Sequence, residues 1–161
     1  MIVIRRAAAG DASLLAQMLA VAADWRRPNP RRATEVLAEP ALGHYVSEWP
    51  RDGDIGFVAE DGTMPVGAAW WRFFSRDDPG YGYIDDSTPE LSIAVVASAR
   101  RRGIGTQLLQ ALIDEAQRSA VPAISLSVDP DNRAASLYRR LGFEERFRTR
   151  GSVTMSYLLT R

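Results

Sequence analysis

Residues 90–128 constrain the fold of this chain more than any other segment. Residues 90–96 and 123–128 each alternate between apolar and small or polar side chains, which predicts two strands. Between them, residues 104–119 predict a helix, because apolar side chains recur along one face at Ile104, Leu108, Leu112 and Ala116. A strand, a helix and a strand in about 40 residues predict a right-handed crossover between parallel strands.

The remaining segments predict antiparallel strands and further helices. Residues 55–60 and 66–74 flank a turn at Asp61-Gly62 and predict a hairpin. Further strands are expected at residues 2–6, 143–148 and 152–160. Helices are expected from a cap at Asp11 or Ser13 to near residue 25, over residues 33–39, and from a cap at Asn132 to Gly142. We expect one α+β domain over residues 1–161, with a mixed, mostly antiparallel central sheet and about four helices in a three-layer α/β arrangement.

Missing residue types exclude several kinds of site. All 20 basic residues are arginines, no cysteine is present, and His44 is the one histidine. A lysine Schiff base, a lysine-containing phosphate loop, a nucleophilic cysteine, a thiolate zinc site and a disulfide each need a residue that the chain lacks. A metal site built on a histidine cluster is excluded as well, so we expect no metal.

Charge and hydropathy argue against two classes of partner. The 20 basic and 20 acidic residues cancel, which gives no long-range attraction to nucleic acid or anionic lipid. The first residues hold no apolar stretch of signal-peptide length, and no run approaches the roughly 18 apolar residues of a membrane span. We expect a cytoplasmic protein that binds neither nucleic acid nor membrane.

The segment that opens the helix at residue 104 favours an anionic ligand. It reads Arg100-Arg101-Arg102-Gly103-Ile104-Gly105-Thr106, without a capping side chain, and the first acidic residue of the helix is Asp114. A helix start has backbone N–H groups without partners and a partial positive charge, and the arginines add to that charge. A phosphate would satisfy both, and the glycines permit its close approach. The alternative is a tight turn with solvated arginines. A dinucleotide motif is disfavoured, since Leu108 occupies the third glycine position.

Two motifs, in order, resemble the GCN5-related N-acetyltransferase (GNAT) family. Arg100-x-x-Gly103-x-Gly105 is similar to the loop with which that family binds the pyrophosphate of acetyl-CoA, and the preceding ELSIAVV and the following Leu108-Leu109 also match. The second motif is Asn132-x-x-Ala135-x-x-Tyr138, which runs into Leu141-Gly142-Phe143. The resemblance is strong over residues 90–143, and Ala97 departs from it where many members carry proline.

The resemblance implies an acyl-CoA N-acyltransferase fold with a splayed parallel strand pair, and a site for acetyl-CoA (coenzyme A). In the implied acetyl-CoA site, the N–H groups from Arg101 to Thr106 hold the pyrophosphate, and the pantetheine arm pairs with the backbone near Val95 to Ala97. The N–H group of Val95 or Val96 polarises the thioester carbonyl. The implied cofactor-binding residues are Val95, Val96, Ala97, Arg100, Arg101, Arg102, Gly103, Ile104, Gly105, Thr106, Asn132, Ala135 and Tyr138. The candidates for the 3′-phosphate are Arg102, Arg133 and Arg139, and a plain helix cap is the alternative for Asn132.

The resemblance also implies a catalytic acid and a base. Tyr138 would protonate the leaving thiolate, although its helical spacing alone favours a core aromatic. Glu90 resembles the family's water-linked base, with a merely solvated glutamate as the alternative, and Asp85 and Asp86 are the other candidates.

The loop at residues 75–89 is the expected acceptor site. Its acidic and aromatic side chains, which suit a cationic amine, are Asp77, Asp78, Tyr81, Tyr83, Asp85 and Asp86. Tyr83, Asp85 and Asp86 are the expected substrate-binding residues. The alternative is a solvated acidic loop that balances a basic domain.

Together these features predict an acetyl-CoA-dependent N-acetyltransferase that acts on a primary amine by direct attack in a ternary complex. The absence of cysteine fits this mechanism, because a cysteinyl acyl-enzyme cannot form. The alternatives are a CoA-binding sensor or scaffold without turnover and an acyltransferase that uses a longer acyl-CoA. The acceptor is expected to be a small-molecule or peptide amine, and we allow for a homodimer.

Overall fold

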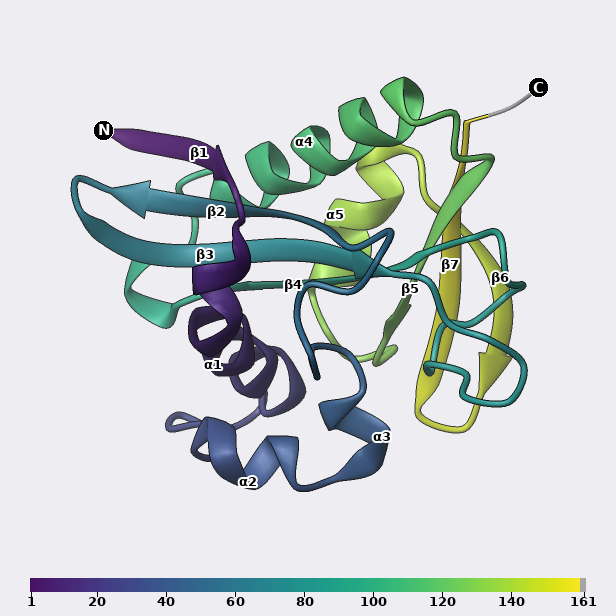
Figure 1. Cartoon of the computed structure of the whole chain (residues 1–161), viewed down its shortest axis with the longest axis horizontal. Coiled ribbons are helices and arrows are strands. Elements are labelled where there is room, and N and C mark those ends of the chain that lie inside the picture. Colours follow the sequence, from purple (N-terminus) through teal and green to yellow (C-terminus); the bar gives the residue numbers. More distant parts are fainter. Residues whose placement is uncertain (160–161) are drawn as a thin grey trace. The chain divides into compact units, whose positions relative to one another are not determined.

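The computed structural model describes residues 1–159 and divides into two compact units (Figure 1). The first unit comprises residues 1–72 and 92–112, and the second comprises residues 73–91 and those from 113 onward. The elements in chain order are β1 (Ile2–Arg6), the 3-10 helix η1 (Ala9–Asp11), α1 (Ala12–Ala23), α2 (Ala33–Leu37), α3 (Pro40–Gly43), β2 (Ile55–Asp61), β3 (Met64–Arg72), β4 (Glu90–Val95), the 3-10 helix η2 (Ala97–Ala99), α4 (Ile104–Arg118), β5 (Ala123–Val128), α5 (Ala134–Leu141), β6 (Glu144–Thr149) and β7 (Ser152–Leu158). Strand β4 and helix α4 each contribute residues to both units.

The seven strands follow the hydrogen-bonded order β1-β2-β3-β4-β5-β7-β6. Strand β1 runs antiparallel to β2, β2 to β3, and β7 to both β5 and β6. Strands β4 and β5 are parallel and pair at a single register, Glu90 opposite Ser125. The predicted α+β class, the mixed sheet and its parallel pair are therefore confirmed, and five α-helices occur in residues 1–159 where about four were expected.

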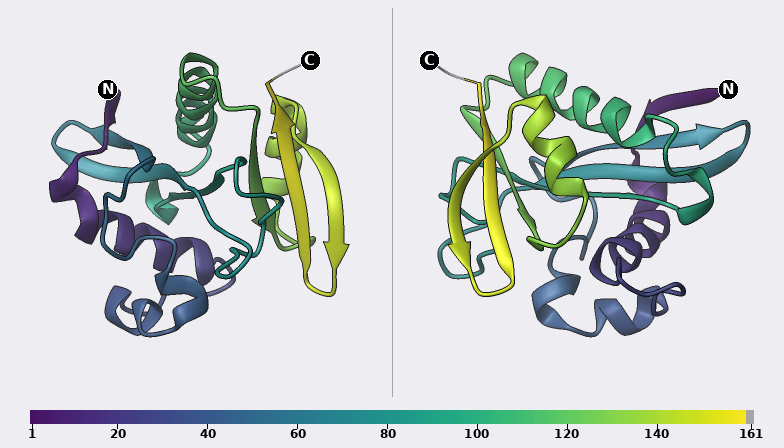
Figure 2. Two further views of the ribbon diagram at one scale, coloured as in Figure 1. Left: turned by 45° about the vertical axis from the view of Figure 1, so that its right-hand side comes forward. Right: turned by 180° about the vertical axis from the view of Figure 1, so that it is seen from behind.

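In the first unit, helices α1 and α4 lie on opposite faces of strands β1–β3 (Figure 2). Gly67 of β3 allows close packing, because a Cβ atom there would lie 3.0 Å from the carbonyl oxygen of Ala94 and 3.3 Å from a Leu108 methyl group. The α1 face that carries Leu15 and Leu19 is buried, as are Leu108 and Leu112 of α4. Burial of these apolar side chains is the main stabilising contribution to such a layered unit.

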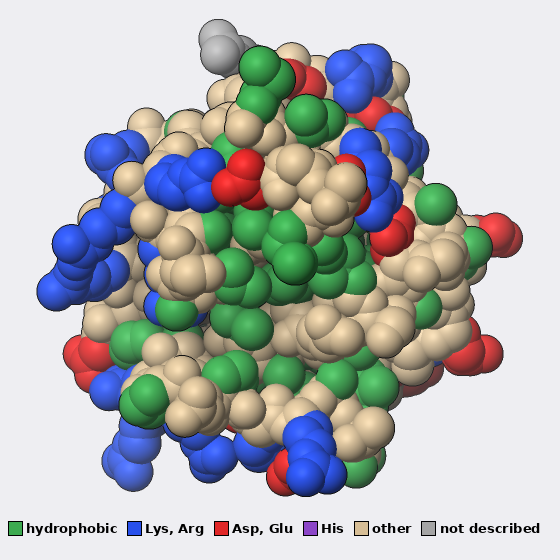
Figure 3. All heavy atoms as spheres, turned by 90° about the vertical axis from the view of Figure 1, so that its left-hand side faces the viewer, with side chains coloured by type: hydrophobic (Ala, Val, Ile, Leu, Met, Phe, Trp, Pro, Cys, Tyr) green, Lys and Arg blue, Asp and Glu red, His purple; other side chains and the backbone are tan. Residues whose placement is uncertain are grey.

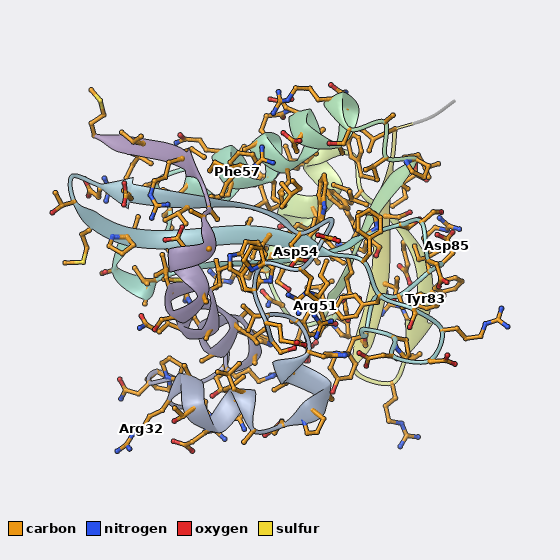
Figure 4. The ribbon with its side chains drawn as sticks, in the orientation of Figure 1. Arg32, Arg51, Asp54, Phe57, Tyr83 and Asp85 are labelled. Atoms are coloured by element: carbon orange, nitrogen blue, oxygen red, sulfur yellow. The ribbon has the colours of Figure 1, made fainter. Side chains whose placement is uncertain are left out.

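A buried ion pair holds the segment between α3 and β2. The Arg72 guanidinium lies 2.7 Å from Asp54, and both side chains are 1% exposed. Arg72 also donates hydrogen bonds to the backbone oxygens of His44 and Ser47 at 3.0 and 2.8 Å. Asp54 and Arg51 lie together in the loop that precedes β2 (Figure 4). Because each buried charge has partners, this irregular segment is fixed to the end of β3.

In the second unit, the loop after residue 72 is attached to strands β5 and β7. Ser125 donates a hydrogen bond to the Gly82 oxygen at 2.8 Å, and Thr154 donates one to the Tyr81 oxygen at 3.4 Å. A Cβ atom at Gly82 would lie 2.6 Å from the Leu126 carbonyl carbon, so only glycine fits this approach.

Helix α5 in the second unit ends as its sequence predicts. Gly142 takes the left-handed conformation at φ 113°, which terminates the helix. The Phe143 ring then packs between Tyr138 and Tyr157, with ring centroids 6.0 and 5.6 Å away.

Most boundaries agree with the sequence to within a few residues, and three expectations need correction. The sequence did not predict α3, and β3 ends at Arg72 rather than at residue 74, because β2 begins at Ile55, opposite Trp71, and residues 73 and 74 have no partner in β2. Helix α2 is shorter than expected and ends at Leu37. The last strand ends at Leu158, and Thr160, which we expected in that strand, lies outside the described residues. The single domain over residues 1–161 stays a prediction.

Candidate functional site

The backbone that leads into α4 is shaped like an anion-binding loop. After η2, Arg101 and Gly103 both adopt the left-handed conformation, at φ 65° and 77°, and the helix starts at Ile104. Its first turn contains no acidic residue. The first helical N–H groups have no carbonyl partner within the helix, and alternation of left-handed residues directs neighbouring N–H groups toward a common point. A left-handed arginine costs about 1–2 kcal/mol, a strain typical of functional loops.

Two of the three arginines in this loop have protein partners. Arg102 forms an ion pair with Asp61 at 3.0 Å, and its guanidinium lowers the pKa of the Asp61 carboxyl. Arg100 donates from Nε to the Val95 oxygen at 3.1 Å. Arg101 is exposed. The sequence predicted neither partner, and the pairing with Asp61 makes Arg102 a weaker candidate for the 3′-phosphate.

The end of β4 distinguishes the two N–H groups that were candidates for polarising a carbonyl. The Val96 N–H donates to the Val66 oxygen in β3 at 2.9 Å, so it is already used. Successive residues of a strand direct their N–H groups to opposite edges. The Val95 N–H therefore points away from β3, on the same edge as the Val95 oxygen that Arg100 contacts. Of the two groups, the Val95 N–H has the orientation that a ligand could use.

A cavity of about 470 Å³ lies in the first unit beside this segment. Two stretches of chain line it, the segment after α1 and the residues between β4 and the loop. The lining residues are Val21, Asp24, Trp25, Arg26, Arg27, Pro28, Pro30, Val96, Ala97 and Arg100. Its volume is that of a small-molecule site. Residues 21–30 are not among the site residues expected from the sequence, where the local signal is limited to a dense run of arginines and prolines.

The segment after α1 is held in place by Asp24. The Asp24 carboxylate accepts hydrogen bonds from the backbone N–H of Arg31 at 2.8 Å and from its Nε and Nη2 atoms at 3.0 Å. These bonds lower the pKa of Asp24, which is 7% exposed. Arg31 also pairs with Glu39. The cavity wall is therefore a fixed loop.

Glu90 is buried, and the solvated alternative for it is wrong. Glu90 is the first residue of β4, and 2% of its surface is exposed. The Ser125 N–H donates to the Pro89 oxygen at 3.0 Å, which ties this end of β4 to β5. A buried carboxylate at a strand end is a common form of catalytic base.

Tyr138 lies within α5 and Asn132 just before it, both in the second unit. Tyr138 is 7% exposed, and burial raises the pKa of its hydroxyl well above 10. The hydroxyl therefore stays protonated at neutral pH. Asn132 accepts a hydrogen bond from the Ala134 N–H at 3.0 Å, but the N-cap of α5 is Arg133, one residue later than expected. Ala135 is buried.

Two acidic side chains of residues 75–89, Asp85 and Asp86, are engaged within their own loop. Asp85 accepts bonds from the Ser87 N–H at 3.0 Å and from its hydroxyl at 2.9 Å. The Tyr83 hydroxyl donates to Asp86, which raises the pKa of Tyr83. Tyr83 and Asp85 both lie on this loop (Figure 4). None of these side chains lines the cavity, and their role in acceptor binding stays a prediction.

Residues 1–159 contain neither a candidate metal-binding cluster nor a candidate membrane-spanning helix. No group of three or more histidine, cysteine, aspartate or glutamate side chains in residues 1–159 could hold a metal ion. No helix there is long and apolar enough to cross a membrane.

Known proteins resemble this chain in sequence. It is 34% identical over 113 residues to N-alpha-acetyltransferase 30 of Schizosaccharomyces pombe, a match that covers 66% of this chain and 69% of the relative. It is 27% identical over 146 residues to L-2,4-diaminobutyric acid acetyltransferase of Nocardia farcinica, covering 76% and 72%.

Solved structures resemble it over nearly its whole length. The crystal structure of ribosomal-protein-alanine N-acetyltransferase from Brucella melitensis matches with a TM-score of 0.70 and 26% identity, covering 98% of this chain and 99% of the other. The N-acetyltransferase of Thermoplasma acidophilum, solved in complex with coenzyme A, shares the fold with a TM-score of 0.66 at 14% identity and covers 99% of both chains. The model of the acetyltransferase (GNAT) family matches residues 18–143, which include the loop at the start of α4, the cavity and Tyr138. The chain therefore belongs to the GNAT family of acetyltransferases.

Proposed function

We propose that this protein transfers the acetyl group of acetyl-CoA to a primary amine by direct attack within a ternary complex. The observation that carries the proposal is the loop at the start of α4, with left-handed Arg101 and Gly103 and no acidic residue in the first helical turn, in a chain of this family. When bound, acetyl-CoA supplies an activated acetyl thioester. The reaction forms a C–N bond, breaks the C–S bond, removes a proton from the amine and returns one to sulfur.

The residues of the loop fit a pyrophosphate. Backbone N–H groups from Arg101 to Thr106 would donate to its oxygens, and the helix dipole adds favourable charge. A Cβ atom at Gly103 would meet no atom within 4 Å, so the outer side of the loop is open to a ligand. Arg101, exposed at the same place, can add a guanidinium. No lysine is needed for this kind of binding.

The edge of β4 that faces away from β3 at Val95 would bind the pantetheine arm and the thioester. The Val95 N–H is the candidate donor to the thioester carbonyl, because the Val96 N–H already donates to Val66. A donor aimed at the developing oxygen charge contributes about 3 kcal/mol to catalysis in comparable sites.

Tyr138 would protonate the leaving sulfur. A phenol at its ordinary pKa is mostly protonated at neutral pH, and the burial of Tyr138 strengthens this preference. A hydroxyl kept protonated until the thiolate forms is suited to act as a general acid.

Glu90 would remove the amine proton, directly or through a water. We expect Glu90→Gln to lower kcat about 100-fold while the affinity for CoA is retained. Glu144→Gln, which changes an exposed glutamate at the start of β6, is the matched control and should leave kcat unchanged. Equal rates in the two variants would remove Glu90 from the mechanism.

The relatives indicate the range of acceptors. Two of them are named for N-terminal or protein acceptors and one for an amino acid, L-2,4-diaminobutyric acid. We infer that the acceptor here is a small-molecule or peptide amine and that the protein acts in the cytoplasm.

An acceptor panel tests this function. The protein is mixed with acetyl-CoA and amino acids, amino-acid amides, polyamines or short peptides, and both free thiol and acetylated amine are measured. We expect equal amounts of the two products with at least one acceptor class. Binding of CoA without thiol release on any acceptor would instead indicate a sensor, and faster transfer from a longer acyl-CoA would correct the donor.

A further inference from the structure

The charge of the cavity in the first unit points to the acceptor. Its lining contains three arginines, Arg26, Arg27 and Arg100, but a single acidic residue, Asp24. The Asp24 carboxylate is already engaged by three donor groups of Arg31, a residue that does not line the cavity. The lining therefore has a surplus of positive charge. On the face drawn in Figure 3, an apolar area is bordered by both basic and acidic side chains.

The rest of the lining is apolar and suits a small organic group. Trp25, Val21, Pro28 and Pro30 form the wall that follows α1. The Arg26 guanidinium lies 4.5 Å from the centre of the Trp25 ring, so the ring supports the charged group. A cavity of about 470 Å³ with an apolar wall and a few charged groups is typical of sites for molecules of amino-acid size.

Arg100 lines the cavity directly before the N–H groups that would hold the pyrophosphate, whereas Arg26 and Arg27 belong to the wall that follows α1. Val96 and Ala97 line the other wall, and under the proposed function this part of the backbone lies beside the uncharged pantetheine arm and the thioester. The pyrophosphate belongs to the N–H groups that begin at Arg101. Arg26 and Arg27 therefore lie across the cavity from the backbone that would hold the pantetheine arm.

We infer that the acceptor is an amine that also carries a carboxylate, such as an amino acid, and that Arg26 and Arg27 bind this carboxylate. The inference rests on the proposed function and specifies its substrate class. It moves the acceptor site from the acidic loop at residues 75–89, whose carboxylates bond within the loop, to the basic segment after α1. Arginine suits the role because its planar fork matches the two carboxylate oxygens.

Matched acceptors test the inference. Each amino acid in a panel is compared with its own amide, which keeps the amine and the side chain but removes the negative charge. We expect the acids to react with kcat/KM at least about 10-fold above the amides. Arg27→Gln should lower kcat/KM for the acids about 10-fold or more, leave the amides unchanged and leave KM for acetyl-CoA unchanged. Arg26→Gln provides a second variant on the same wall.

Arg32→Gln is the control for loss of charge. Arg32 is exposed at the start of α2, points outward and does not line the cavity (Figure 4). We expect this variant to show the wild-type preference for acids. Amides that react as fast as the acids would overturn the inference while the proposed function stands. A rise in KM for acetyl-CoA in Arg27→Gln would also overturn it, because the arginine would then serve a cofactor phosphate. If acetyl-CoA binds but no amine of either kind is acetylated, the proposed function itself fails.

Discussion

A single charge placed at Gly103 should separate the electrostatic role of the loop from its shape. Gly103 lies at φ 77°, and a Cβ atom there would meet nothing within 4 Å, so side chains fit without a clash. Asparagine and aspartate both tolerate the left-handed conformation better than other residues and have nearly the same size. The variants Gly103→Asn and Gly103→Asp therefore share their backbone cost and differ by one negative charge.

The expected difference follows from Coulomb's law. A carboxylate about 5 Å from a phosphate charge is repelled by about 1–3 kcal/mol for effective dielectric constants between about 80 and 20. Gly103→Asp should thus bind CoA about 5- to 150-fold more weakly than Gly103→Asn. Because the charges are near the surface, the gap should narrow as salt is raised.

Calorimetric titration with CoA at low and high salt measures this difference, with thermal unfolding as the check that both variants fold. Equal affinities of Gly103→Asp and Gly103→Asn at low salt would refute the reasoning, because no phosphate could then lie against the loop.

Three further predictions concern catalysis and stability. Tyr138→Phe should lower kcat about 100-fold with unchanged CoA affinity. Because burial raises the pKa of Tyr138 above 10, the wild-type protein should lose no activity through deprotonation of this hydroxyl up to about pH 9.5. Gly82→Ala should lower the melting temperature by about 3–10 °C, because its Cβ atom would overlap the β5 backbone, whereas Gly10→Ala, with open space around its Cβ position, should have little effect in the same calorimetric scan. Asp24→Asn should lower the free energy of unfolding in urea at pH 7 by about 1.5–3 kcal/mol, because the charged hydrogen bonds to Arg31 are lost. These bonds lower the pKa of Asp24 below its usual 3.8. Their contribution to stability is therefore present above pH 3.8 and is lost as the pH falls through the lower pKa of the folded state.

The sequence predicted those parts of the fold that depend on local signals. Alternation defined β4 and β5, the helical stripe defined α4, and Gly142 marked the end of α5. The unusual start of α4 was also visible, because an uncapped first turn next to glycines is a local property. These signals need no knowledge of distant residues, which is why they sufficed.

The remaining features depend on contacts between distant parts of the chain. Arg102 meets Asp61 across 41 residues of sequence, and the Val96 N–H meets the Val66 oxygen across the β3–β4 connection. No local pattern indicates either pairing. The burial of Glu90 similarly depends on its register opposite Ser125 of β5.

The acceptor side shows most clearly where composition was an insufficient guide. Charge alone favoured the acidic loop, but the hydrogen bonds of Asp85 and Asp86 stay within that loop. The segment after α1, where Asp24 and Arg31 fix a cavity wall, carried no motif and emerged only from the packed structure.

The central claim is that acetyl-CoA, held at the start of α4, gives its acetyl group directly to an amine. A single-turnover experiment with the protein in excess of acetyl-labelled acetyl-CoA, quenched with and without the best acceptor and analysed by mass spectrometry, tests it most directly. We predict that the mass of the protein stays unchanged at all times, that label reaches the amine in amounts equal to the released thiol, and that Gly103→Asp shows little transfer at the same concentration. Label that first appears on the protein and then moves to the amine, or undiminished transfer by Gly103→Asp, would contradict the account.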